Sequence, residues 1–437
     1  MEGFKKQQLI KLLLMVAVLI AMAIPADLFA ITNSFEWGFT DFNFSPPGAR
    51  ASGMGGAFVA LADDATCAVS NPAGLAQLPR TQIAVEGSYR HYDDTHETKN
   101  WYPGTASEST SSTETAVKNN TRLSFASFST PLFNNSVNVS LFYDKLAYSN
   151  SDISYNTGRR QTGYNKVSID EYGIGVAKGF FEDKLFLGAG LSEANLDLKS
   201  SFVFKEYTGS TGMVFTDSQD SFGSSTKMAY RIGLLFVPWD FLRVGLNYSR
   251  MPSFNYQLES ASCMTKGGNC YNNETILIKR TMDYKIPDTF SAGAAVKPTK
   301  DWTIITEAKY VKYSDLLDGF AIAQCIVNSS GKCVNPEDLN GGNYKIPDVW
   351  EFHLGTEYIL RVDETPIALR TGTYYEPKHS LYANDKTSYY NLYNGGKDIW
   401  HWTGGVGTVL YKHWQIDAAV DLAKDKDKVT LSMVYQF

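Results

Sequence analysis

Cysteine and histidine are scarce in this sequence. Its 437 residues include only five Cys and six His, which excludes a disulfide-dense miniature scaffold and leaves few ligands for a metal cluster. Basic residues are not in excess either, because Lys plus Arg number 40 against 46 for Asp plus Glu, and a nucleic-acid groove needs a basic domain. We therefore expect no metal, no cofactor and no nucleic-acid partner.

Long apolar runs are missing beyond the N-terminus. No stretch after residue 30 reaches the roughly 18 consecutive apolar residues of a spanning helix, and the mean hydropathy is -0.23, which together exclude a polytopic helical membrane protein. The chain is nevertheless 43% hydrophobic and 14% aromatic, too much for a disordered chain. Any residence in a membrane must come from a different architecture.

The first 30 residues have the three-part layout of a secretory signal peptide. Three lysines precede an apolar run over residues 12–24, and small residues follow up to Ala30. The run is about 13 residues, short of the roughly 20 that a spanning helix needs, so a signal peptide over residues 1–30 is favoured over a membrane anchor. We expect an exported chain, cleaved after Ala30 or Ala23.

Export permits disulfide bonds. The short spacings of Cys263 from Cys270 and of Cys325 from Cys333 predict two small loops closed by covalent bonds, with Cys67 left over. Four reduced thiols are the alternative. The mass shift on alkylation with and without reductant distinguishes the two.

From about residue 81 to the end, apolar side chains recur at every second position. In the last segment Val429, Leu431, Met433, Tyr435 and Phe437 share one face. Successive side chains of a strand point to opposite sides, so this pattern predicts strands with one apolar face. Fourteen segments qualify: 81–93, 119–131, 136–149, 167–180, 184–203, 224–237, 241–258, 276–297, 301–313, 346–361, 366–377, 398–411, 413–423 and 428–437.

The joints between these segments alternate in length. Joints after even-numbered strands are short and turn-like, and those after odd-numbered strands are mostly long and polar, at 94–118, 150–166, 204–223, 259–275, 314–345 and 378–397. A transmembrane β-barrel shows this alternation, with turns on one rim and loops on the other. Closure leaves no unpaired strand edge in lipid. Four aromatic residues near the turns suit an interfacial girdle: Trp239, Trp302, Tyr411 and Trp414.

These patterns predict an all-β membrane protein of the outer membrane. Its architecture is a fourteen-stranded antiparallel transmembrane β-barrel over residues 81–437, with an N-terminal plug, or hatch, over residues 31–80 in the lumen. The plug segment is compact and rich in small residues, which permits close packing. Its Gly53-Met54-Gly55-Gly56 run suggests a dinucleotide loop only superficially, since no strand precedes it in a βαβ unit.

Three stretches carry a resemblance to a known family. They are residues 51–57, the run 62–65 leading into Asn71-Pro72-Ala73, and Lys285-Ile286-Pro287-Asp288 with the Asp301-Trp302-Thr303 that follows its strand and turn. In these stretches the sequence resembles the FadL/TodX family of outer-membrane transport proteins for hydrophobic compounds. The resemblance covers nearly the whole mature chain. It implies a fourteen-stranded barrel closed by an N-terminal hatch, carrying long-chain fatty acids or aromatic hydrocarbons inward.

The resemblance also implies site residues. Asn71, Pro72 and Ala73 match the family's hatch motif and would lie near the bottom of the lumen, although Asn-Pro also favours a purely structural turn. The mature N-terminus of family members can reach into the ligand pocket, a position that Phe35 and Trp37 would occupy here.

The third strand departs from the family pattern. Family members have a lateral gap at a kinked third strand, but residues 137–148 contain no Gly or Pro, and Asp144 and Lys145 interrupt the stretch instead. This departure counts against a lateral exit.

The predicted function is uptake of hydrophobic compounds by passive, hatch-gated diffusion. The expected partners are hydrophobic small molecules and outer-membrane lipid, with the barrel a monomer. The main alternative is a non-transporting barrel that binds partner proteins as a secretion-system accessory, and a water-filled porin is another.

Catalysis and cation binding are weaker interpretations. An enzyme is not expected, since no Gly-x-Ser-x-Gly elbow occurs and the His residues lack an evident nucleophile. The acidic and amide-rich loop around residues 384–398 lacks the spacing of a calcium loop and is interpreted as a solvated turn.

Overall fold

A single antiparallel sheet, closed on itself, contains most of the described chain. The computed structural model describes residues 44–100, 109–134, 136–157, 159–208, 213–266, 269–270, 276–317, 326–327, 333–334, 344–363, 365–379, 382–383, 398–424 and 426–437. None of the helices within these ranges has the length and apolarity that membrane crossing by a helix requires.

The sheet consists of long strands in its first half and shorter ones in its second half. The bounds are β1 (Gln82–Asn100), β2 (Ser109–Leu132), β3 (Val137–Thr157), β4 (Arg159–Phe180), β5 (Leu185–Thr208), β6 (Met213–Trp239), β7 (Leu242–Arg250), β8 (Ser253–Lys266), β9 (Asn269–Cys270), β10 (Ile276–Lys285), β11 (Thr289–Thr299), β12 (Trp302–Val311), β16 (Val349–Val362), β17 (Thr365–Glu376), β19 (Ile399–Leu410), β20 (Trp414–Leu422) and β21 (Lys426–Gln436).

These segments form fourteen wall strands. β7 and β8 both pair with β6 and are one wall strand, interrupted at Met251 and Pro252. β10 and β11 pair with β8 and β7 respectively and are the next wall strand, interrupted at residues 286–288. β9 is a short extension paired with β8. β1 pairs with β2 on one side and with β21 on the other, which closes the barrel.

The fourteen predicted strands are confirmed, but their lengths in the first half are not. The joints predicted as polar loops at 94–118, 150–166, 204–223 and 259–275 lie largely within strands. β6 begins at Met213, for example, where the prediction began at residue 224. The period-two signal reports an apolar face, and it disappears once both faces of a strand contact water, although the backbone ladder continues.

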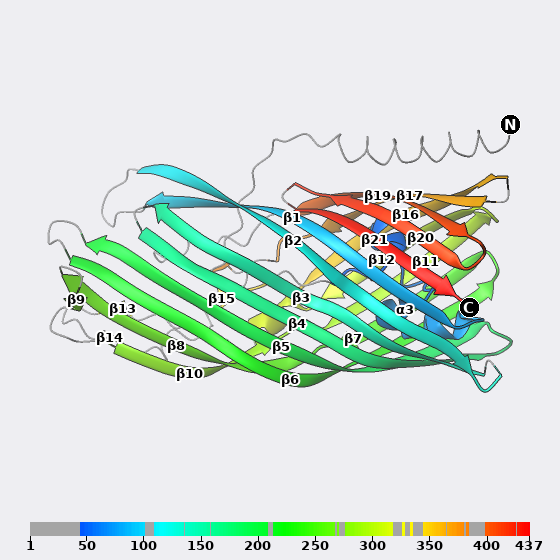
Figure 1. Ribbon diagram of the computed structural model, residues 1–437, viewed down its shortest axis with the longest axis horizontal. Helices are drawn as coiled ribbons and strands as arrows, with labels where there is room; N and C mark the ends of the chain where they lie inside the picture. The colour runs from blue at the N-terminus through cyan, green and yellow to red at the C-terminus, as the bar shows by residue number, and fades with distance from the viewer. Residues whose placement is uncertain are drawn as a thin grey trace.

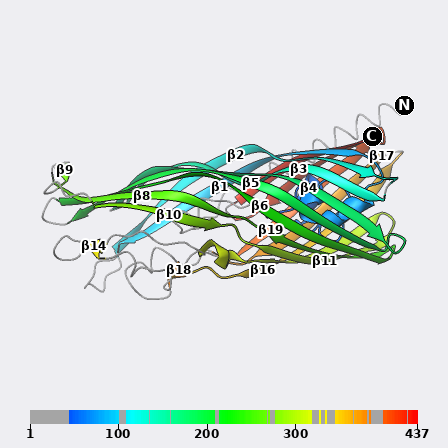
Figure 2. The same ribbon diagram turned by 90° about the horizontal axis from the view of Figure 1, so that it is seen from below.

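One side of the barrel is therefore much taller than the other. β1 to β6 contain 19 to 27 residues, whereas β20 and β21 contain 9 and 11, and about 9–11 tilted residues suffice to cross a bilayer. Figures 1 and 2 show the long strands extending beyond the short ones at the loop end. The wall formed by the long strands projects well past the membrane.

Two rows of outward aromatic side chains mark the membrane boundaries. Near the turns Phe133, Phe181, Trp239, Trp302, Tyr411 and Trp414 are exposed. Nearer the loops, neighbouring strands bring together Tyr143 with Tyr172, Tyr230 with Tyr248, Tyr310 with Trp350, and Tyr375 with Trp400. Exposed aliphatic residues lie between the rows, including Leu141, Ile174, Ile232 and Leu431. This is the aromatic-apolar-aromatic surface of a barrel in lipid.

Residues 44–80, called here the luminal segment, lie inside the barrel near its turn end, where Figure 1 shows their helices in blue. They contain α2 (Ala49–Gly53), α3 (Cys67–Ser70) and the 3₁₀-helix η1 (Pro72–Gln77). Most of their side chains are buried. Wall glycines make room for them: a Cβ on Gly245 would lie 2.1 Å from the Val59 carbonyl oxygen, and one on Gly355 would lie 2.2 Å from that of Met54.

The remaining described elements lie on the loop side. η4 (Tyr313–Leu317) follows β12, β13 (Ile326–Val327) pairs with β14 (Cys333–Val334), and β15 (Tyr344–Lys345) pairs with β18 (Tyr382–Ala383).

Candidate transport site in the barrel lumen

Side chains of the wall satisfy the peptide groups of the luminal segment. Glu307 of β12 accepts the backbone N–H groups of Phe58 and Val59 at 2.9 and 3.0 Å. Thr403 of β19 accepts the N–H of Gly55 at 2.8 Å and donates to the carbonyl of Gly53 at 3.1 Å. Because an irregular segment cannot pair its own buried peptide groups, these polar side chains on the inner face are what allow residues 44–80 to occupy the lumen.

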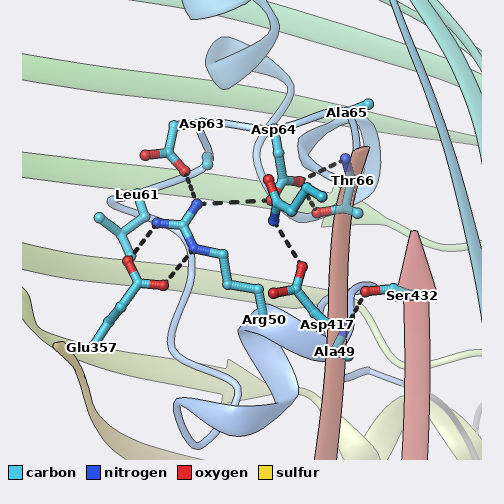
Figure 3. Close-up of polar contacts among 12 residues, drawn as sticks. Ala49, Arg50, Leu61, Asp63, Asp64, Ala65, Thr66, Glu357, Asp417 and Ser432 are labelled. Carbon is cyan, nitrogen blue, oxygen red and sulfur yellow. Dashed lines mark hydrogen bonds and ion pairs between the residues drawn. The ribbon is translucent and has the colours of Figure 1, made fainter. Parts of the chain in front are cut away.

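Arg50 forms the strongest ionic link between the luminal segment and the wall (Figure 3). Its Nε and Nη2 both donate to Glu357 of β16 at 2.9 Å, and its Nη1 contacts Asp63 at 2.6 Å. Arg370 of β17 extends the network, donating to Glu357 and Asp417, each at 2.7 Å. Bidentate arginine–carboxylate pairing is a strong and directional form of ion pair, so it fixes α2 against β16.

The two acidic residues of the luminal segment differ in their surroundings. Burial raises the pKa of Asp64, which accepts hydrogen bonds from the backbone and hydroxyl of Thr66. For Asp63, burial is again the largest effect and raises the pKa, but the positive charges of Arg50, Arg243 and Lys297 together outweigh it, so the pKa is lowered. The network therefore retains a charged Arg50–Asp63 pair.

Asn71, Pro72 and Ala73 lie near the turn end of the lumen, packed against Gly188 of β5 and Gly233 of β6. The Asn71 side chain donates to the carbonyls of Val59 and of Leu234 in β6 at 2.8 and 3.1 Å, and its Oδ1 accepts the Ala73 N–H at 3.2 Å. Pro72 occupies the first turn of η1, where it needs no N–H. The motif thus ties two parts of the luminal segment to the wall.

An apolar cluster lies on the loop side of the luminal segment. On β4, Gly175 faces Leu75 of the segment, whereas Ile169 of the cluster is six residues nearer the loops, about 20 Å along the strand. Its members are Leu146, Ala147, Val167, Ile169, Ala194, Leu196, Met251, Phe254, Tyr256, Leu258, Tyr284, Ile286, Val311, Tyr313, Leu316, Ile346 and Val349, with Phe44, Leu198 and Leu317 packed against them. An apolar surface inside the lumen is suited to a hydrophobic ligand.

The wall divides beside this cluster. Pairing between β2 and β3 ends at Phe125 and Asp144; beyond them, among the residues that the structure describes, β2 pairs only with β1 and β3 only with β4. Each strand has a bulge at this point, at Ser124 in β2 and at Leu146 in β3. We call this divergence the split.

The third strand thus bends without Gly or Pro. A β-bulge inserts one unpaired residue and bends its strand whatever the residue type, so the expectation drawn from the absence of Gly and Pro in residues 137–148 is wrong about the kink. The bulged Leu146 is 2% exposed and belongs to the apolar cluster. The cluster therefore extends to the edge of the split.

The Lys285-Ile286-Pro287-Asp288 stretch belongs to an exact repeat whose second copy was not selected from the sequence. Tyr-Lys-Ile-Pro-Asp occurs at 284–288 and again at 344–348, and both isoleucines belong to the apolar cluster. Asp288 accepts the N–H of Met251 at 2.9 Å, and Asp348 accepts that of Ser314 at 2.8 Å. Asp288 thus binds the interruption between β7 and β8, and Asp348 binds the region just after the end of β12. The repetition itself was the signal in the sequence.

Several predicted site residues cannot be placed. Phe35 and Trp37 lie outside the described residues, as does Cys325. For Cys263, Cys270 and Cys333 only the backbone is described; Cys270 is paired with Thr265 and Cys333 with Val327. The two disulfides remain predictions, and Cys67 is a buried free thiol.

A closed fourteen-stranded barrel with lipid-facing girdles, an occupied lumen and an internal apolar cluster defines an outer-membrane transport barrel. The family model for the outer membrane protein transport proteins (OMPP1/FadL/TodX) matches residues 43–429. The chain belongs to this family and is an outer-membrane protein. No curated protein gives a significant match.

Solved structures share the fold at low sequence identity. A Pseudomonas aeruginosa FadL homologue aligns with 14% identity and a TM-score of 0.64, covering 91% of this chain and 99% of its own. The Pseudomonas putida toluene transporter TodX aligns with 12% identity and a TM-score of 0.58, covering 90% and 99%. The CymD monoaromatic hydrocarbon channel aligns with 13% identity and a TM-score of 0.59, covering 91% and 99%.

Proposed function

We propose that this barrel takes up hydrophobic compounds, long-chain fatty acids or aromatic hydrocarbons, by passive diffusion gated by the luminal segment. The observation that carries the proposal is the position of the apolar cluster, between the loop end of the barrel and the luminal segment. Burial of each methylene group of a ligand there contributes about 0.8 kcal/mol, so capture needs no energy source. Passive transport needs no catalytic residues. The proposed transporter is a monomeric barrel surrounded by outer-membrane lipid.

Two routes lead away from the cluster. One passes the luminal segment toward the turn end, and requires Arg50 to release Glu357. The other leads sideways through the split, which begins at Asp144, beside the loop-side aromatic Tyr143. Because the luminal segment is held by many polar contacts, its movement would act as the slow, gated step, whereas the split needs no such rearrangement.

The substrate class can be tested by extraction. Purified, folded barrel and a mock preparation from the same cells are extracted, and hydrophobic molecules are identified by mass spectrometry. Recovery of fatty acid or hydrocarbon in stoichiometric amount is the expected result. A barrel that is empty in several detergents would contradict it and favour the partner-binding alternative.

Gating can be tested by locking the luminal segment. The Ala49 N–H lies 2.9 Å from Ser432 Oγ of β21, so an Ala49→Cys, Ser432→Cys pair can be oxidised to join segment and wall. Oxidation should remove the share of uptake that passes the luminal segment and reduction should restore it, with each single variant as control. Unchanged uptake in the oxidised barrel would show that the gated route is wrong and leave the split as the path.

A further inference from the structure

Asp144 is a buried carboxylate with an oxygen that no described residue binds. Its side chain is at the beginning of the split, opposite Phe125 in the last rung between β2 and β3. The residue is 2% exposed, and its Oδ1 has no hydrogen-bond partner in the described part of the chain. An isolated polar atom of this kind is costly to bury.

The neighbouring carboxylates are, by contrast, fully engaged. Glu86 of β1 accepts hydrogen bonds from the Gly48 N–H and the Ser124 hydroxyl. Glu171 of β4 accepts from both terminal nitrogens of Arg231 and from a serine hydroxyl. The hydrogen bonds of Arg231 go to Glu171 and to Ser192. Of these three buried carboxylates, Asp144 is the one with an oxygen that has no hydrogen-bond partner in the described part of the chain.

The surroundings of Asp144 are suited to an apolar molecule. Phe142 and Leu146 flank it on the inner face of β3, and Phe125 lies across from it; all three are at most 5% exposed. The Asp144 Oδ1 is an acceptor between the paired carboxylates of Glu86 and Glu171 on one side and the edge of the apolar cluster on the other, and it complements a ligand that is apolar except for one donor.

We propose that Asp144 is a specificity residue, and that its carboxyl oxygen accepts a hydrogen bond from the hydroxyl group of an otherwise apolar ligand, a phenol or a long-chain alcohol. This inference rests on the proposed function, because it assumes that hydrophobic ligands reach the apolar cluster and the split. A plain hydrocarbon enters the same surroundings without that bond. The barrel therefore prefers the hydroxylated member of two molecules of the same carbon skeleton.

The test compares matched ligands. Binding of p-cresol and toluene, and of 1-decanol and decane, is measured on the purified full-length barrel, and the ratio of hydrocarbon to hydroxylated dissociation constants is calculated for each pair. Asp144→Leu should reduce this ratio by about 2–10-fold, the net value of one hydrogen bond, while toluene and decane bind about as before. Asp144→Asn retains an acceptor and should reduce the ratio less. Asp240→Asn, exposed in a turn, is the matched control.

The possible results distinguish a failure of the Asp144 proposal from a failure of the proposed function on which it rests. If the wild-type barrel binds the hydrocarbons but the ratio is the same in both Asp144 variants, the role of Asp144 is wrong and the proposed function stands. If it binds none of the four probes, both are wrong. Heat-modifiable migration on gels shows whether each variant is folded. If Asp144→Leu does not fold, the ratio of dissociation constants in Asp144→Asn is compared with that of the wild type. An unchanged ratio in Asp144→Asn would overturn the proposal.

Discussion

Phe125 and Asp144 form the last rung between β2 and β3, and a bulge follows on each strand, at Ser124 and at Leu146. The two strands that leave this rung pair with different neighbours, so the wall is divided from here to the loop end. The division of the wall is therefore built into strand register.

Deleting Leu146 should close the split. Lys145 pairs with Asp170 and Ala147 with Ile169, so removal of the bulged residue restores a regular register in which each remaining side chain keeps its face. The strand should straighten, and uptake of a radiolabelled hydrophobic substrate should fall by the share that leaves through the split. Leu146→Ala, which keeps the bulge and removes most of the side chain, is the control. Normal uptake by the deletion variant would exclude the lateral route.

Breaking the Arg50–Glu357 pair should loosen the luminal segment. The two side chains are 15% and 5% exposed, and removing one partner of a buried ion pair costs about 3–5 kcal/mol. Arg50→Ala should therefore raise single-channel conductance in planar bilayers and sensitivity to large antibiotics. Arg361→Ala breaks a pair with Asp301 that is 66% and 37% exposed and should change neither. Equal conductance of the two variants would show that the segment does not depend on Arg50.

Adding a methyl group to the wall should displace the Asn71 turn. A Cβ on Gly233 would lie 2.1 Å from Asn71 Oδ1, whereas one on Gly404 would meet no atom within 4 Å. Overpacking costs about 1–3 kcal/mol, so Gly233→Ala should lower the melting temperature and increase proteolysis within residues 44–80. Gly404→Ala should behave as wild type. Identical stability of the two variants would contradict the close contact between η1 and β6.

Alkylation should divide the cysteines into two classes. Cys67 is buried, and burial raises the pKa of its thiol well above the ordinary value, so it should not react in the folded barrel at neutral pH. If the predicted disulfides form, Cys263, Cys270, Cys325 and Cys333 should react only after reduction. Mass spectrometry after alkylation, with and without reductant and denaturant, gives the number of alkylated cysteines. Four additional labels without reductant would exclude both disulfides.

The sequence predicts the part of the fold that lipid imposes. Segments such as 428–437 alternate because one face contacts hydrocarbon, and all fourteen were found from that alternation. The upper part of β6, from Met213, has no such constraint and could not be recognised. The bulge at Leu146 could not be predicted either, because bulges follow from register between strands and not from composition.

The candidate site was less accessible to prediction than the barrel. The family motif located Asn71-Pro72-Ala73, and the structure gives these residues anchoring contacts. Arg50 and Glu357 are 307 positions apart, and nothing in the local sequence of either indicates the other. The Tyr-Lys-Ile-Pro-Asp repeat could have been noticed, since it needs only a search for internal identity.

The polar contacts of the luminal segment also set an order of assembly. This segment precedes every strand in the chain, yet its peptide groups are bound by Glu86 of β1 and by Ser432 of β21, which become neighbours only when the first and last strands pair. Residues 44–80 can therefore complete their contacts only after the barrel has closed. A barrel halted before closure would hold an undocked N-terminal segment, so docking of this segment is a natural mark of finished insertion.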